Sequence, residues 1–87
     1  MYIIELVLKF TPFPLSVQRM ELASAQSLYS KIIKAIQQGH PKLLELTCEK
    51  VDGKKIAVLV DEIIGIQIYE KTSSSSGNKK PGFSFEN

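Results

Sequence analysis

The chain has 87 residues, an apolar fraction of 44% and a formal net charge of +2, with lysines and glutamates interspersed. This length suits one globular domain, and the apolar fraction excludes a chain that is disordered throughout. The slight charge argues against the clearly basic surface that is typical of nucleic-acid binders.

Cysteine content and hydropathy indicate the compartment. Cys48 is the single cysteine of the sequence, so no intrachain disulfide forms, which fits a reducing environment. The N-terminus lacks the basic segment of a signal peptide. No run approaches the roughly 20 apolar residues that span a bilayer. We therefore expect a soluble, cytoplasmic protein.

Two strands are predicted before the first helix. Residues 2–11 alternate between apolar and mixed positions, which indicates a strand with one face in the core. Proline at positions 12 and 14 interrupts the pattern, because proline lacks the N–H that a β-ladder needs. A short second strand follows, at a sheet edge. The predicted core face of the first strand comprises Tyr2, Ile4, Leu6, Leu8 and Phe10, and the second strand alternates at Phe13, Leu15 and Val17.

From about Met20 the apolar period changes to three or four residues, which predicts an amphipathic helix. Gly39 and Pro41 mark its C-terminal end. The predicted apolar stripe comprises Leu22, Ala25, Tyr29, Ile32 and Ile36.

Residues 43–71 predict a three-stranded antiparallel meander. Asp52-Gly53 lies between alternating runs and is a strong signal for a two-residue hairpin turn of type I′. That turn would place Leu46 opposite Leu59. The expected core face then carries Leu44, Leu46, Cys48, Ala57 and Leu59, and the opposite face carries Glu45, Thr47, Glu49, Ile56, Val58 and Val60. The last strand, from Ile63 to Lys71, has Ile64, Ile66 and Ile68 on one side, and its Gly65 indicates a bend or bulge.

These elements predict an α+β fold with the order β-β-α-β-β-β, in which a mostly antiparallel sheet packs one face on the single helix. Residues 1–71 form the expected single domain. Residues 72–87, TSSSSGNKKPGFSFEN, have the composition of a flexible tail. The pattern leaves open whether the sheet stays open or curls into a half-barrel at Gly65.

No set of residues predicts catalysis, a cofactor or a metal ion, and we expect a protein that is not an enzyme. His40, the single histidine, follows the end of the predicted helix as a surface loop residue. Cys48 lies on the expected core face, where a structural thiol is the default. Asp61-Glu62 with Glu45 and Glu49 lacks the spacing of a calcium loop. Residues 52–55 lack the glycine pattern of a phosphate loop.

Partner binding is the function that the pattern favours. Ile56, Val58 and Val60 make the second sheet face too apolar for a solvated surface, and Phe83 and Phe85 are aromatic residues in a polar tail. These five residues are the candidate partner-binding residues, for a protein partner or a homodimer. A small RNA-binding domain is the alternative. Its cationic residues would be Arg19, Lys31, Lys34, Lys42, Lys54 and Lys55, without the aromatic motif of ribonucleoprotein domains.

Four segments carry a resemblance over essentially the full length: YIIELVLKFTPFPLSVQR, LLELTCEK, IQIYEKT and PGFSFEN. Together they resemble a small uncharacterised protein family found in cyanobacteria. The resemblance implies a cyanobacterial source and a cytoplasmic location. It implies no activity, cofactor or site residue.

Overall fold

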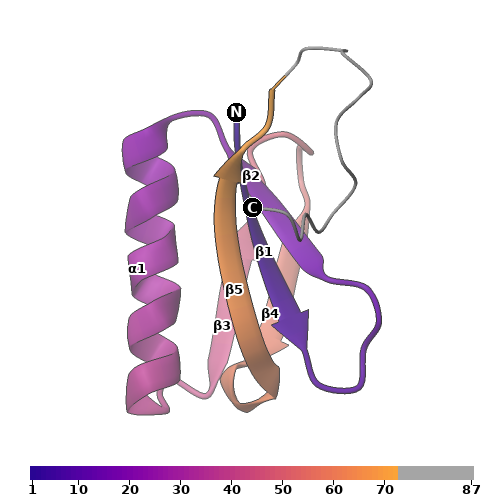
Figure 1. Cartoon of the computed structure of the whole chain (residues 1–87), viewed down its shortest axis with the longest axis vertical. Helices are drawn as coiled ribbons and strands as arrows, with labels where there is room; N and C mark the ends of the chain where they lie inside the picture. The colour runs from indigo at the N-terminus through magenta and orange to yellow at the C-terminus, as the bar shows by residue number, and fades with distance from the viewer. Residues whose placement is uncertain (73–87) are drawn as a thin grey trace, which may run out of the picture.

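A computed structural model of the chain describes residues 1–72. It shows an α+β fold with the predicted order of elements (Figure 1). The predicted tail lies, apart from Thr72, outside the described residues. The elements are β1 (Tyr2–Leu8), β2 (Leu15–Arg19), α1 (Leu22–Gln38), β3 (Leu43–Thr47), β4 (Lys55–Leu59), the short 3-10 helix η1 (Val60–Glu62) and β5 (Ile63–Glu70).

β1 is the central strand of a three-stranded antiparallel sheet with the order β2-β1-β5. Ile4 of β1 lies opposite Val17 on one side and Ile68 on the other. The alternation predicted for β1 is confirmed, because Ile4 and Leu6 are fully buried. Phe10 is the exception: it follows the strand and is 100% exposed, so its predicted place on the core face is wrong.

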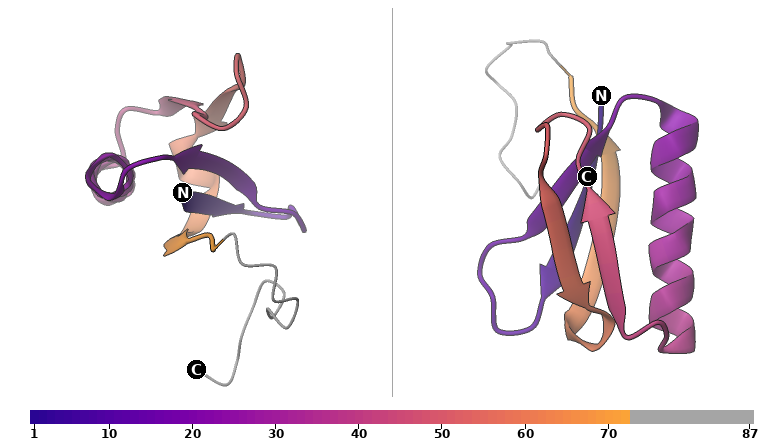
Figure 2. Two further views of the ribbon diagram at one scale, coloured as in Figure 1. Left: turned by 90° about the horizontal axis from the view of Figure 1, so that it is seen from above. Right: turned by 180° about the vertical axis from the view of Figure 1, so that it is seen from behind.

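The helix α1 packs against the inner face of this sheet and contacts β1, β2, β5 and η1 (Figure 2). It buries Ala25, Ile32 and Ala35. Gly39 ends it in the left-handed conformation, with φ 75°, and its N–H donates to the carbonyl of Ala35 at 2.8 Å. The predicted helix and its glycine terminus are both confirmed, but the predicted place of Leu22 on the buried stripe is wrong, because Leu22 begins the helix and is 46% exposed.

β3 and β4 form a separate two-stranded antiparallel sheet whose register differs by three residues from the predicted one. Leu44 lies opposite Val58, and Leu43 lies opposite Leu59. A type I′ turn needs positive φ at both central residues. Among the non-glycine residues of 1–72, Phe10 alone has a positive φ, so φ at Asp52 is negative. In this turn Gly53 is thus the one central residue with a positive φ.

The predicted hairpin turn is therefore at the right place but of the wrong type. The Lys54 N–H donates to the Val51 carbonyl at 3.2 Å, and the strands pair only from Thr47 and Lys55 outward. An odd shift of register moves one strand's side chains to the opposite face. Ala57 and Leu59, which were expected in the core, are consequently exposed.

The third strand of the predicted meander does not pair with β4. Instead β5 crosses to the other sheet and pairs with β1. Val7 lies opposite Gly65 and Leu8 opposite Ile63, so Ile64 is the extra residue of a β-bulge. The bulge predicted at Gly65 is confirmed. Because of the bulge, Ile63 is buried while Ile64 is 63% exposed. The prediction that Ile64 shares a face with Ile66 and Ile68 is therefore wrong, since those two residues pack against the core.

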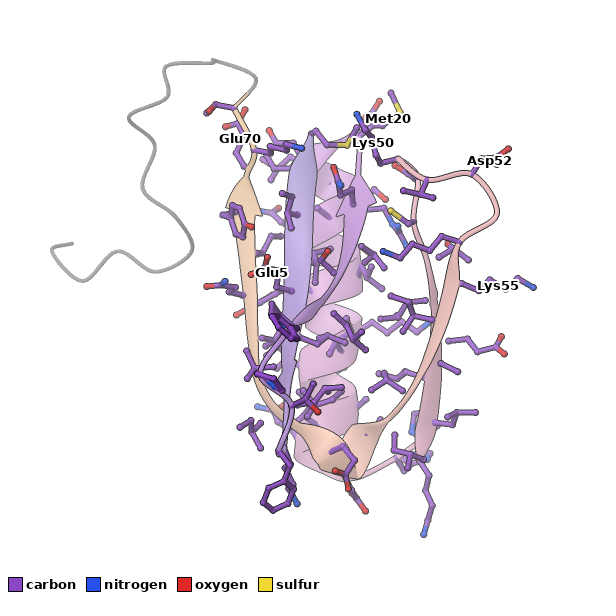
Figure 3. The ribbon with its side chains drawn as sticks, turned by 90° about the vertical axis from the view of Figure 1, so that its right-hand side faces the viewer. Glu5, Met20, Lys50, Asp52, Lys55 and Glu70 are labelled. Carbon is purple, nitrogen blue, oxygen red and sulfur yellow. The ribbon has the colours of Figure 1, made fainter. Side chains whose placement is uncertain are left out.

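The two sheets meet along β2 and the end of β3 (Figure 3). The Glu49 N–H donates to the Gln18 carbonyl at 3.0 Å. The Arg19 guanidinium donates to the carbonyls of Thr47 and Gln18, at 2.6 and 3.0 Å. The Lys54 ammonium donates to the Ser16 carbonyl at 3.1 Å. We call this contact the seam. The hydrophobic core contains residues of both sheets and of α1.

Candidate functional site

The predicted apolar sheet face is part of the core. Val58 and Val60 are 5% and 3% exposed, and Ile56 packs against the same cluster. The expectation that these residues form an open face for a partner is wrong, because the hairpin register differs by an odd number of residues from the predicted one. The other two candidates, Phe83 and Phe85, lie outside the described residues.

The residues weighed for chemistry do not assemble into a centre within the described part of the chain. No three His, Cys, Asp or Glu side chains among residues 1–72 lie close enough together to hold a metal ion. Glu49 is engaged at the seam, where its carboxylate accepts the Met20 N–H at 2.7 Å. His40 is exposed in the connection after α1.

Cys48 lies at the seam and is 7% exposed. Burial raises the pKa of its thiol, but hydrogen bonds from the backbone of Val51, Gln18 and Lys50 and the charge of Lys54 outweigh burial and lower it. A reactive thiol needs access as well as a lowered pKa. The burial of Cys48 therefore fits the structural role expected from the sequence.

The end of the fold at which β1 ends and β5 begins carries several exposed apolar side chains. Six of the ten large hydrophobic residues that are more than a third exposed in residues 1–72 belong to this end. The Lys9 N–H donates to the Glu62 carbonyl at 2.9 Å, and the Val60 N–H donates to the Lys42 carbonyl at 2.8 Å, which brings the contributing segments together. We call this end of the fold the apolar end; its exposed apolar residues are Val7, Phe10, Phe13, Leu43, Leu59 and Ile64.

The loop between β1 and β2 supplies the two phenylalanines of the apolar end. Phe10 has φ 57° and is fully exposed, and Phe13 is 75% exposed between two prolines. Within this loop the Thr11 hydroxyl donates to the Lys9 carbonyl at 3.0 Å. Sequence reasoning placed both phenylalanines in strands. The prolines at 12 and 14 were the available signal that this segment leaves the sheet.

The outer face of the three-stranded sheet carries a small polar cluster around Glu5. The Gln67 side-chain amide donates to one carboxylate oxygen at 2.6 Å, and the Tyr69 hydroxyl donates to the other at 3.0 Å. Burial, the hydrogen bond to Glu5 and the charge of Glu5 raise the pKa of Tyr69 to about 12. The Tyr69 hydroxyl is therefore a donor throughout the neutral range and is not poised to act as a base.

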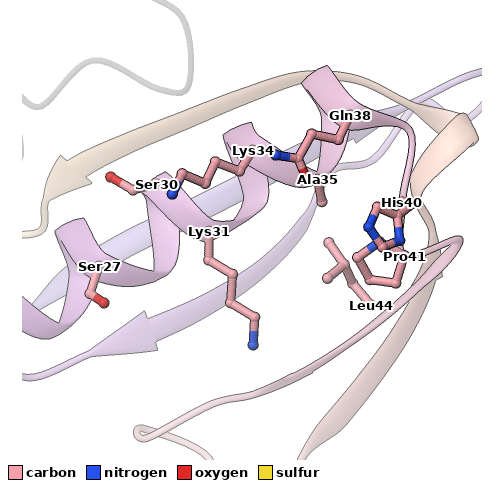
Figure 4. Close-up of a pocket in the computed structure, with 9 residues that line it drawn as sticks. All are labelled: Ser27, Ser30, Lys31, Lys34, Ala35, Gln38, His40, Pro41 and Leu44. Atoms are coloured by element: carbon pink, nitrogen blue, oxygen red, sulfur yellow. The ribbon is translucent and has the colours of Figure 1, made fainter.

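A shallow groove of about 470 Å³ runs along α1 beside the start of β3 (Figure 4). Lys31 and Lys34 line it together with His40, and the helix carries no acidic residue. The two lysine side chains leave the helix in different directions. The groove therefore offers a weakly cationic surface rather than a converging set of ligands. The cationic residues predicted for RNA binding do not form one surface, because Arg19 and Lys54 donate hydrogen bonds at the seam.

Comparison with known proteins places the chain in a family. The model of the UPF0367 protein family matches residues 3–71, which contain nearly all of the described strands and the whole helix. The chain belongs to the UPF0367 protein family.

UPF0367 proteins of Prochlorococcus and Synechococcus match along the full chain. The relative from Prochlorococcus marinus strain NATL1A is 59% identical over 87 residues and covers 100% of both chains. Those from Prochlorococcus marinus strain MIT 9303 and Synechococcus sp. strain WH7803 are each 56% identical over 86 residues, covering 99% of both chains. These matches confirm the resemblance seen in the sequence. No solved structure matches the chain.

Within residues 1–72 the structure contains no helix that is both long enough and apolar enough to cross a membrane.

Proposed function

We propose that this UPF0367 protein is a small non-enzymatic interaction module that binds a protein partner through the apolar end. The observation that supports this most is Phe10, a fully exposed aromatic residue in the left-handed region. Such a backbone costs a non-glycine residue about 1–2 kcal/mol. Strain of this kind persists mostly where it has a functional role.

The energetics favour a partner over open solvent. Burying one phenylalanine side chain gains about 1.5–3 kcal/mol, so Phe10 and Phe13 together offer several kcal/mol to a complex. The prolines flanking Phe13 restrict the loop before binding, which lowers the entropy that a partner must remove. Aromatic anchors held on a constrained loop are typical of binding hot spots.

The test is affinity capture from cyanobacterial lysate treated with ribonuclease, using the full chain as bait. The double variant Phe10→Ser/Phe13→Ser changes the apolar end. Met20→Ser/Leu22→Ser is the matched control, because these two exposed residues lie at the opposite end of β2. We expect specific proteins that bind the wild type and the control to be lost from the Phe10→Ser/Phe13→Ser variant.

Equal capture by all three chains would show that the apolar end binds no partner. A circular dichroism spectrum of each variant checks that it folds, which is expected because all four substituted side chains are exposed.

RNA binding is the second candidate, and the helix surface supports it. Lys31 and Lys34 lie on an acid-free helix beside His40. Phosphate contacts make binding weaken steeply with salt. If RNA is the ligand, a labelled oligonucleotide should show a lower fluorescence anisotropy with the Lys31→Gln/Lys34→Gln variant than with the wild type. Its anisotropy with Lys55→Gln should equal that with the wild type. Binding that is insensitive to salt and to both variants would reject this candidate.

A further inference from the structure

β5 has one edge that pairs with no other strand of residues 1–72. The Lys71 N–H donates to the Met1 carbonyl at 2.8 Å, so Lys71 turns its backbone toward β1. Along an antiparallel strand, successive residues point their backbone N–H and C=O groups to opposite sides. Tyr69 and Gln67 therefore also point these groups toward β1, while Ile68 and Ile66 point them away from it. Within residues 1–72, none of the hydrogen bonds outside the ladders involves Ile66 or Ile68.

No other helix or strand of residues 1–72 covers this edge. β5 is a border strand of its sheet. In Figure 1 it lies in front of the other strands, and in Figure 3 it forms one side of the sheet. In neither view does an element of residues 1–72 lie beyond it. Helix α1 packs on the inner face of the sheet, not along this border.

Two of the other border strands, β2 and β4, carry features that protect their edges. The outward carbonyls of β2, those of Ser16 and Gln18, accept from Lys54, Glu49 and Arg19 at the seam. β4 is short, five residues, and it begins with a lysine that follows another lysine. Edge lysines and short edges prevent unwanted pairing. β5 has eight residues and no lysine or proline between Ile63 and Glu70.

We propose that β5 pairs with β5 of a second copy of this chain, in antiparallel orientation, to form a six-stranded sheet across a two-fold axis. Outward residues must face outward residues, so only registers that pair even positions with even positions are possible. Centring the pair on Gln67 places Ile66 beside Ile68 of the second copy. It also places Tyr69 opposite Gly65 of the second copy, which has no side chain to clash with the ring.

The neighbouring registers are less favourable. Centring on Ile66 brings Glu70 opposite Glu62 of the second copy, and like charges directly opposite destabilise a strand pair. Centring on Ile68 places the carboxylate of Glu70 beside Ile66. The register centred on Gln67 opposes no like charges and begins just after the bulge at Ile64. This surface differs from the apolar end, so the dimer goes beyond the proposed function and does not depend on it.

The two-fold axis gives a specific test, because Gln67 then lies opposite Gln67 of the second copy. Light scattering of the full chain should give about twice the monomer mass of 9.7 kDa. Gln67→Lys and Gln67→Glu should each be monomeric, since each opposes two like charges. An equimolar mixture of the two variants should recover the doubled mass. Gln67→Met is the control: it also loses the bond to Glu5 but should remain dimeric.

Hydrogen exchange adds a residue-level readout. The amides of Ile66 and Ile68 should be protected from exchange in the wild type and should lose that protection in Gln67→Lys. The amide of Tyr69, which faces β1, is the internal control and should stay protected in both. A monomeric wild type would overturn the proposal. The proposal would also be overturned if the Phe83→Ser/Phe85→Ser variant lost protection at Ile66 and Ile68 while its mass stayed that of the wild type. That result would mean that residues 73–87 of the same chain occupy the edge. An unchanged mass in Phe10→Ser/Phe13→Ser separates this dimer from the proposed partner site.

Discussion

At the residue scale, Glu5 organises the outer face of the three-stranded sheet. Its two carboxylate oxygens accept from Gln67 and Tyr69, both on the neighbouring strand. The contact requires Tyr69 to keep its proton. Burial of the phenol is the first reason for the raised pKa of Tyr69, and the hydrogen bond to Glu5 and the negative charge of Glu5 raise it further.

Titration of the tyrosines should therefore show one phenol with a pKa of about 12. Glu5→Gln should shift that pKa down toward its ordinary value, because the negative acceptor is removed. The pKa of Tyr69 is higher in the folded chain than in the unfolded chain. Its contribution to stability is present below the unfolded value of about 10 and is lost as the pH rises through about 12. Near-ultraviolet absorbance against pH measures the effect, and an unshifted Glu5→Gln curve would contradict it.

At the element scale, local pattern predicted what local interactions determine. The 3.6-residue period and Gly39 located α1, and the period of two located the buried Ile4 and Leu6. The hairpin register was not predictable in this way. Glu49 leaves the β3 ladder because its N–H bonds to Gln18, a residue far away in sequence. The pairing of β5 with β1 also joins segments that lie far apart in the sequence, so a local pattern could not predict it.

The turn at Asp52-Gly53 tests the corrected account of the hairpin. Gly53 has φ 81°, and a Cβ there would meet nothing within 4 Å. The cost of Gly53→Val is therefore conformational only, and we expect a loss of about 1–2 kcal/mol in the free energy of unfolding. Gly53→Asn should lose much less, because asparagine tolerates this region. Urea unfolding measures both variants, and equal losses would point to a role of the turn other than its backbone conformation.

At the scale of the whole molecule, two sheets are held as one body by the seam. β2 and β3 do not form a ladder with each other. Their contact relies on a few bonds to backbone carbonyls, of which the one from Arg19 to Thr47 is the shortest. The phenylalanines of the apolar end and the edge of β5 could be recognised only once this arrangement was known, because each depends on which segments are left uncovered.

Arg19→Met should loosen the hairpin relative to the three-stranded sheet. We expect a loss of about 1.5–3 kcal/mol in the free energy of unfolding, the range for hydrogen bonds that involve a charged group. Amides of β3 and β4 should exchange faster, while those shared by β1 and β5 stay protected. Lys55→Met is the control, because Lys55 is exposed. Uniformly faster exchange in all strands would show that the sheets open together.

The central place of β1 has a consequence for synthesis of the chain. Glu5 and Gln67 face each other across β1 and β5 although they are 62 residues apart. A ribosome adding about 5–20 residues per second makes β5 about 3–12 s after β1. During that interval one side of the central strand has no neighbour, and the side chains of Ile4 and Leu6 lack part of their cover. The nascent chain is thus most open to chaperones and to wrong strand partners before β5 emerges.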